Sequence, residues 1–175
     1  MSDRVILNTE ITNNLISTDI LGIIEKYQKK GGKNYFFTPT ISIKLFKPKV
    51  TWIDSTKKNV SFLFKKHENL NLYTMLRNVN NSLTYFYKTK AYNPIDNISP
   101  FFYEKGDYFY VKSYLPNING KYLINSYLNN IEEIFKVPRI GIIYDVIILD
   151  IRNIWEKDNH AGFNLELKET CINIT

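Results

Sequence analysis

The sequence predicts a mainly β domain of the α+β class: an OB-like antiparallel Greek-key barrel with two or three added helices. About seven short stretches alternate apolar and polar residues with a period of two, which is typical of half-buried strands. Few stretches show helical spacing, and strands do not alternate regularly with helices as in a parallel α/β fold. The 175 residues suit one hydrophobic core, so we expect a single domain over residues 1–175.

The first part of the chain predicts one helix and several short strands. Asp19 can cap a helix whose apolar residues in Ile20–Tyr27 share one face, and Gly31 and Gly32 would end it. After Pro39 the period changes to two, which favours strands. The strands expected in this part are Val5–Ile11, Thr40–Phe46, Val50–Ile53 and Asn59–Lys66.

The rest of the chain predicts further helices and longer strands. Leu70–Leu83 has the pattern of an amphipathic helix, and Lys121–Val137 favours another helix that Pro138 would end. Glu156–Gly162 is expected to be a polar turn. The strands expected here are Thr84–Tyr92, a tyrosine-dense strand within Phe101–Leu115, Arg139–Trp155 and Phe163–Ile174.

Positive charge is concentrated in one region of the sequence. The formal net charge is +6, and lysine supplies most of it, with 19 Lys against 4 Arg. Between Lys26 and Lys66 there are eleven lysines and one acid, Asp54. A lysine-rich stripe suits attraction to phosphates irrespective of sequence better than bidentate reading of bases. The alternative is a solvated face that serves solubility and binds no ligand.

Cysteine usage and hydropathy predict an intracellular location in a reducing compartment. Cys171 is the only cysteine, so no intramolecular disulfide and no cysteine-based zinc site are expected. Residues 1–30 lack the basic start and long apolar run of a signal peptide. The longest apolar run, near Ile140–Leu149, is broken by Asp145 and is too short to span a bilayer. We therefore expect a protein that is not secreted and does not bind membranes.

No catalytic residue, metal site or cofactor site is predicted, so we do not expect an enzyme. His67 and His160 lie in polar turns without a partner at metal-ligand spacing. Gly31-Gly32-Lys33 is too short for a phosphate-binding loop, and Cys171 on an alternating strand fits a small packed residue. A further acidic series matches no metal signature and suits the surface of a hairpin: Asp145, Asp150, Glu156 and Asp158.

Aromatic residues are interleaved with lysines on three predicted strands. The chain has 13 Tyr and 11 Phe, so we expect some rings to face a ligand. Hydroxylated rings beside a cation suit stacking on unpaired bases, although the same rings could form cross-strand pairs on a wet sheet. The lysines expected to follow a nucleic-acid backbone are Lys44, Lys47, Lys49, Lys65, Lys66, Lys88, Lys90 and Lys112. The rings expected to stack on bases are Trp52, Tyr85, Tyr87, Tyr108, Tyr110 and Tyr114.

The C-terminal segment Ile151–Ile172 resembles the last hairpin of OB-fold single-stranded DNA-binding proteins from tailed phages and large DNA viruses. In that family an aromatic-containing strand, a polar turn and a glycine precede an alternating strand, and Trp155 and Gly162 stand at these places here. Heavy use of Asn, Ile, Lys and Tyr, which have AT-rich codons, agrees with a viral source. Many family members end in an acidic tail that recruits replication partners, whereas Glu169–Thr175 is not acidic.

The first hypothesis is therefore a non-enzymatic single-stranded DNA-binding protein of viral or phage replication or recombination, in the host cytoplasm or a viral replication site. The second is a viral structural or assembly protein whose tyrosines form subunit contacts. An RNA-binding factor is a third, because stacking and phosphate contacts serve both nucleic acids, with DNA favoured by the resemblance. Homo-oligomer formation is left open.

Overall fold

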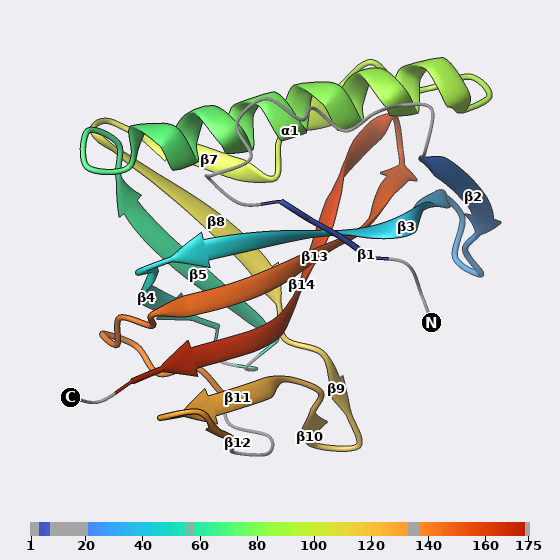
Figure 1. Cartoon of the computed structure of the whole chain (residues 1–175). Coiled ribbons are helices and arrows are strands. Elements are labelled where there is room, and N and C mark those ends of the chain that lie inside the picture. The colour runs from blue at the N-terminus through green and yellow to red at the C-terminus, as the bar shows by residue number, and fades with distance from the viewer. Residues whose placement is uncertain (1–3, 8–20, 55, 57, 133–136, 174–175) are drawn as a thin grey trace.

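The computed structural model describes residues 4–7, 21–54, 56, 58–132 and 137–173 as a curved sheet with one long helix lying across it (Figure 1). Twelve strands share one sheet, whose main path runs β1-β3-β13-β14-β8-β5-β4, and β9 and β10 form a separate pair. The mainly β class is thus confirmed. The elements are β1 Arg4–Leu7, β2 Gly22–Tyr27, β3 Lys33–Phe46, β4 Lys49–Ile53, β5 Asn59–Lys65, α1 Leu70–Lys90, β6 Ile98–Ser99, β7 Phe102–Lys105, β8 Tyr108–Tyr114, β9 Asn117–Ile118, β10 Lys121–Tyr122, β11 Asn125–Leu128, β12 Ile131–Glu132, β13 Val146–Lys157 and β14 His160–Ile172.

The hairpin of β13 and β14 forms the centre of the sheet. β13 pairs antiparallel with β3 on one side and with β14 on the other. The hairpin turns at Asp158 and Asn159, whose φ angles of 51° and 63° are typical of a two-residue turn with the twist of a hairpin. The turn predicted over Glu156–Gly162 is therefore shorter, and the last strand begins at His160.

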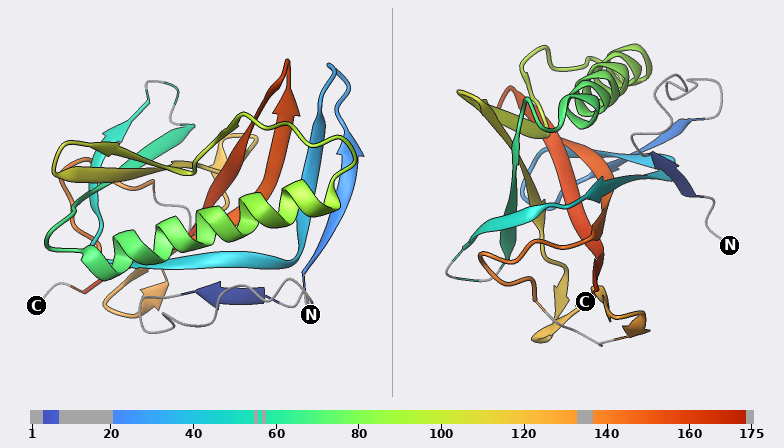
Figure 2. Two further views of the ribbon diagram at one scale, coloured as in Figure 1. Left: turned by 90° about the horizontal axis from the view of Figure 1, so that it is seen from above. Right: turned by 60° about the vertical axis from the view of Figure 1, so that its left-hand side comes forward.

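The sheet curls back so that its last strand, β4, meets the segment that precedes β13. β14 pairs in parallel with β8 at Glu166 and Tyr114, and β8 continues antiparallel into β5 and then β4. Beyond β4, the Val50 N–H donates to the Ile142 carbonyl over 3.0 Å, in the segment that precedes β13. Figure 2 shows this wrapping from two sides. The strand pairs of the described residues do not close a barrel, so the predicted OB-type Greek-key barrel stays a prediction.

α1 packs on the curved sheet through an apolar stripe. Phe86 of this stripe lies beside Phe37 of β3, with ring centroids 6.4 Å apart. The stripe continues past Leu83, which is why the helix runs on to Lys90 and why the strand predicted at Thr84–Tyr92 is wrong. The buried residues of α1 recur every three or four positions: Leu72, Met75, Leu76, Val79, Leu83, Phe86 and Tyr87.

The helix predicted from Asp19 to Tyr27 is also wrong over its described part. Residues 22–27 form β2, which pairs antiparallel with β3, whereas Asp19 and Ile20 lie outside the described residues. The two glycines turn this hairpin instead of ending a helix. Gly32 has φ +93°, and a Cβ there would lie 2.4 Å from the Glu156 carbonyl oxygen, so a larger residue does not fit.

A third predicted helix, Lys121–Val137, is replaced by short strands, with residues 133–136 outside the described part. β11 pairs in parallel with β14, so this segment is held by main-chain bonds to the sheet edge. Asn129 and Asn130 follow with φ angles of 49° and 63°, a left-handed pair that an α-helix cannot contain. The described residues therefore contain one helix, fewer than the two or three predicted.

Two acids predicted to lie on a hairpin surface are buried instead. Asp150 is 2% exposed and accepts a hydrogen bond of 2.6 Å from the Ser42 hydroxyl of β3. Glu156 accepts hydrogen bonds from the hydroxyls of Tyr35 and Tyr87, whose rings are in contact at 5.2 Å. These bonds compensate the loss of water around a carboxylate. Glu156 thereby links β13 to both β3 and α1.

The raised pKa values of the two tyrosines beside Glu156 predict that the protein loses stability at alkaline pH. Burial, with the Glu156 charge, raises the pKa of Tyr35 to about 12. Burial and the hydrogen bond to Glu156 also raise the pKa of Tyr87. In the unfolded chain both hydroxyls lose their protons near pH 10. Their contribution is therefore whole below pH 10 and falls above it, through about 12 for Tyr35, by at most ~1.4 kcal/mol per pH unit for each group.

Urea unfolding of Tyr87→Phe at pH 9, 10 and 11 checks this expectation. The variant should be less stable at pH 9, because Glu156 and the Ile95 N–H, which donates to the Tyr87 oxygen over 2.9 Å, both lose a partner. Its stability should then fall less steeply with pH. Tyr85→Phe removes an exposed hydroxyl and is the control for titration of surface groups. Equal slopes in the two variants would contradict the assignment.

Candidate nucleic-acid interface

The sheet formed by β4, β5, β8 and β7 is apolar on one side and carries rings and amines on the other. Phe62, Phe109 and Val111 on the inner side are completely buried. Alternate residues of β5, β7 and β8 point outward. On β4 a register shift between Val50 and Trp52 puts both Lys49 and Trp52 beside outward residues of β5. We call this surface the candidate face and define it as Lys49, Trp52, Leu63, Lys65, Tyr103, Lys105, Tyr108, Tyr110, Lys112 and Tyr114.

Strand register arranges the candidate face in rows. Tyr103 of β7, Tyr110 of β8 and Leu63 of β5 are direct cross-strand neighbours. The rings of Tyr103 and Tyr110 are stacked, with centroids 5.3 Å apart and planes inclined by 22°. In the neighbouring row the Lys112 Nζ lies 5.3 Å from the centroid of the Trp52 ring. Rings and cations are therefore intermixed on the candidate face, both along β8 and between neighbouring strands.

The rings of the candidate face remain accessible to a ligand. Trp52 and Tyr114 are 44% and 43% exposed, and Tyr103 and Tyr108 are 40% and 39% exposed. Tyr110, the cross-strand neighbour of Tyr103, is half-buried. Aromatic faces held on a rigid sheet and open to water are what unpaired bases stack on, whatever the base.

Lysines at the rim and between the rings make the candidate face basic. Lys49, Lys65, Lys105 and Lys112 are all exposed. Lys65 forms an ion pair of 3.0 Å with Glu68, and their hydrogen bond raises the pKa of Lys65. Both partners of this pair are in water, so the pair contributes little stability and a phosphate group can replace the carboxylate. The arrangement provides charge-based attraction to a phosphate backbone.

Half of the residues predicted from the sequence meet on the candidate face. The sequence predicts a tyrosine-dense strand within Phe101–Leu115 and no hairpin there, so it does not identify Tyr103 and Lys105. Gly106, with φ +59°, instead turns β7 back along β8 and puts Tyr103 beside Tyr110. The Gly106-Asp107 pair was the available turn signal. The predicted residues that the structure brings together are Lys49, Trp52, Lys65, Tyr108, Tyr110, Lys112 and Tyr114.

The residues predicted on a strand at 84–92 lie on the last turns of α1. Tyr87 is completely buried against Glu156, so it cannot stack on a base, and this prediction is wrong. Tyr85 is exposed, and Lys88 pairs with Asp96 over 3.0 Å. Together with Lys90 these side chains belong to the helix and not to the candidate face.

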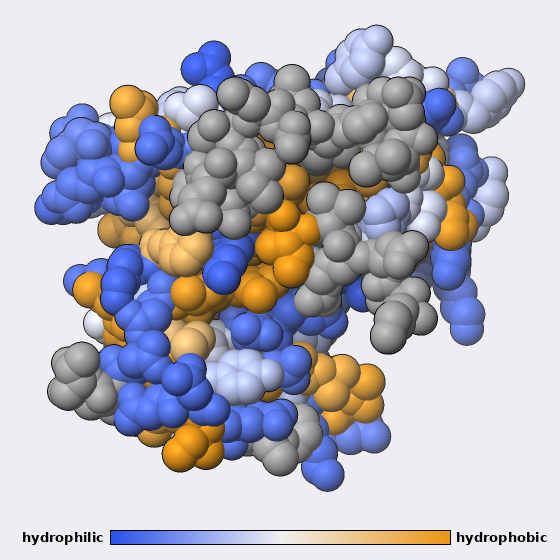
Figure 3. All heavy atoms as spheres, in the orientation of Figure 1, coloured by the Kyte–Doolittle hydropathy of each residue, from blue (hydrophilic) through white to orange (hydrophobic). Residues whose placement is uncertain are grey.

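Three more predicted lysines lie outside the candidate face and have partners of their own. Lys44 of β3 places its Nζ 5.4 Å from the ring centroid of Phe46. Lys47 pairs with Asp145, and Lys66 pairs with Glu104 over 3.0 Å. In Figure 3 the side of the molecule that carries β3, β13 and β14 shows apolar and hydrophilic side chains intermixed. The basic stripe predicted over Lys26–Lys66 is therefore divided between several surfaces.

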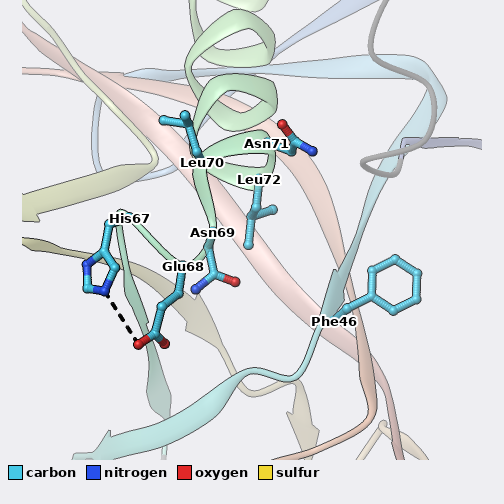
Figure 4. A pocket seen from close by; sticks show the side chains of 7 residues that line it. All are labelled: Phe46, His67, Glu68, Asn69, Leu70, Asn71 and Leu72. Carbon is cyan, nitrogen blue, oxygen red and sulfur yellow. Dashed lines mark ion pairs between the residues drawn. The ribbon is translucent and has the colours of Figure 1, made fainter.

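A hollow of about 350 Å³ at the start of α1 adds nothing to the candidate face. His67 Nε2 lies 3.5 Å from Glu68 Oε1, and both side chains stand apart from the Phe46 ring on the other side of the hollow (Figure 4). His67 is exposed, as predicted for a turn histidine. Within the described residues no three His, Cys, Asp or Glu side chains are grouped so as to hold a metal ion. No helix in that part of the chain has the length and apolar character that a membrane crossing needs.

Comparison with known proteins finds similarity in structure and none in sequence. No protein-family model and no curated protein matches the sequence. The single-stranded DNA-binding protein from bacteriophage Enc34, solved in complex with ssDNA, is similar with a TM-score of 0.54 and 9% identity, over 85% of this chain and 93% of that chain. Its C-terminal truncation gives a TM-score of 0.51 and 9% identity, over 87% and 95% of the two chains. The resemblance seen in the C-terminal hairpin is thus confirmed for the fold: this chain is folded like a phage single-stranded DNA-binding protein.

Proposed function

We propose that this chain binds single-stranded DNA without catalysing a reaction, in viral or phage DNA replication or recombination, and that the candidate face holds the strand. The observation that carries the proposal is that exposed rings and lysines share one side of a sheet whose other side is core. The rings stack on bases and the ammonium groups contact phosphates. Neither interaction depends on the base sequence.

The fold supports this proposal. The path β4-β5-β8-β14-β13-β3, with a parallel step from β8 to β14, is compatible with an OB-type barrel whose β4 returns to the segment before β13. OB folds bind oligonucleotides on the face of their central strands. β5 and β8 are central to the candidate face. The phage protein with a similar fold was solved with ssDNA bound, which is the ligand proposed here.

A titration with short oligothymidine tests the proposal. Trp52 lies on the candidate face, whereas Trp155 lies against Gly162 in the C-terminal hairpin, so Trp155→Phe leaves Trp52 as the fluorescent reporter. We expect its emission to change on binding. With about four lysine–phosphate contacts, the logarithm of the affinity should fall with the logarithm of salt with a slope near −3. Micromolar or weaker binding without a salt slope would refute the proposal.

Two further measurements distinguish DNA binding from RNA binding and from a role in assembly. Oligouridine of equal length tests for RNA, and clearly tighter binding to it would move the assignment from DNA to RNA. Light scattering without nucleic acid tests for an assembly role, since aromatic side chains are also enriched at protein interfaces. A large oligomer that persists at high salt and hides Trp52 would favour subunit contacts over DNA.

A further inference from the structure

A hollow of about 600 Å³ opens between α1 and β7 and adjoins the candidate face. Tyr103 and Tyr110 belong to the candidate face and also line the hollow, so a bound strand can pass from one to the other. α1 contributes Arg77 and Asn81, and β7 contributes Glu104. The volume lies within the range of small-ligand sites, and rings with a few converging polar groups are their usual lining.

The polar groups of this hollow are of two opposite kinds. Arg77 has an exposed guanidinium, which can only donate hydrogen bonds. The Glu104 carboxylate accepts hydrogen bonds from the Tyr73 hydroxyl at 2.5 Å and from Lys66 Nζ at 3.0 Å. These bonds, with the nearby Arg77 charge, lower the pKa of Glu104, so it is an ionised acceptor at neutral pH. Donors and an acceptor thus line one hollow beside a stacked pair of rings.

Guanine matches this set with two separate edges, one of acceptors and one that carries donors. Its O6 and N7 accept the two hydrogen bonds that an arginine donates, and its N1–H and N2–H groups donate to a carboxylate. Thymine offers one N–H between two carbonyls and cannot satisfy both partners. On the basis of the function proposed above, we propose that the hollow holds one unstacked guanine of the bound strand, with Arg77 and Glu104 as its recognition residues. The protein then combines general binding with a preference at one position.

Nucleotide analogues test this with the unmodified chain. One deoxyguanosine is placed within a short oligothymidine, and its affinity is compared with that of oligothymidine alone. We expect about tenfold tighter binding for the guanine-containing strand, which corresponds to ~1.4 kcal/mol. Replacing guanine by 7-deazaguanine removes the N7 acceptor for Arg77, and hypoxanthine removes the N2 donor for Glu104. Each analogue should lose most of the gain.

Variants assign the preference to the two residues. Arg77→Gln and Glu104→Gln should bind the two oligonucleotides with nearly equal affinity. Lys121→Gln, which removes the same charge as Arg77→Gln at an exposed site on β10, should keep the tenfold ratio. Equal affinities of the unmodified chain for strands with and without guanine would overturn this inference and leave the proposed function intact. Failure to bind any oligonucleotide would overturn the proposed function itself.

Discussion

Replacing Trp52 and Tyr108 together by alanine is expected to weaken binding of single-stranded DNA by about 2–6 kcal/mol, because each stacked base contributes about 1–3 kcal/mol. The two rings lie on β4 and β8, in different rows of the candidate face, and share no ring contact, so their effects should add. Both are more than one-third exposed, so the fold loses little when they are removed. An oligothymidine titration at fixed low salt measures the effect.

A pair of tyrosines outside the candidate face provides the control for this expectation. Tyr85 and Tyr92 are 65% and 78% exposed and lie on and just after the end of α1, away from the candidate face. Their joint replacement by alanine should change the affinity by less than about 0.5 kcal/mol. A large loss in this control, with none for Trp52 and Tyr108, would move the binding surface to the helix end. Urea unfolding of both variants shows whether the fold is preserved.

The composition of the candidate face could be predicted in part because strand periodicity is a local property. Tyr108, Tyr110, Lys112 and Tyr114 are two residues apart, so any strand over them shows all four on one side. Their neighbours could not be predicted. The pairs Lys65–Tyr108 and Leu63–Tyr110 join residues more than forty positions apart, and strand register across an intervening helix is decided by packing.

The failures of prediction have the same origin. Thr84–Tyr92 is rich in aromatic residues, which favours a strand locally, yet Phe86 and Tyr87 continue the apolar stripe that starts at Leu72. Burial on the sheet decides between the two patterns and makes the segment helical. Asp150 and Glu156 carry charges that suggest a surface in sequence. Their partners Ser42, Tyr35 and Tyr87 come from other parts of the chain, so their burial is visible only in the fold.

Removing the ring behind the candidate face should have the largest effect on stability: Phe109→Ala is expected to lower the free energy of unfolding by about 3–5 kcal/mol. Phe109 is completely buried and stacks on Phe64, with centroids 5.2 Å apart and planes inclined by 14°. It also contacts Tyr73 of α1 at 5.6 Å and Phe102 of β7 at 6.5 Å. One side chain thus joins β5, β7, β8 and the helix, so its loss leaves a cavity where these four elements meet.

Two substitutions at Phe109 distinguish an effect on the stability of the fold from an effect on DNA binding. Phe109→Leu keeps much of the volume and should cost less than Phe109→Ala, and Phe46→Ala, on an exposed ring, should cost little. Phe109 lies between Tyr108 and Tyr110 on β8. Its packing in the core holds β8 in place, and the position of β8 determines where the two tyrosine rings point. Phe109→Leu should therefore bind oligothymidine nearly as well as the unmodified chain at temperatures where it is folded. If Phe109→Ala unfolds at the same urea concentration as the unmodified chain, the apolar side of this sheet is not the core that holds the candidate face in place.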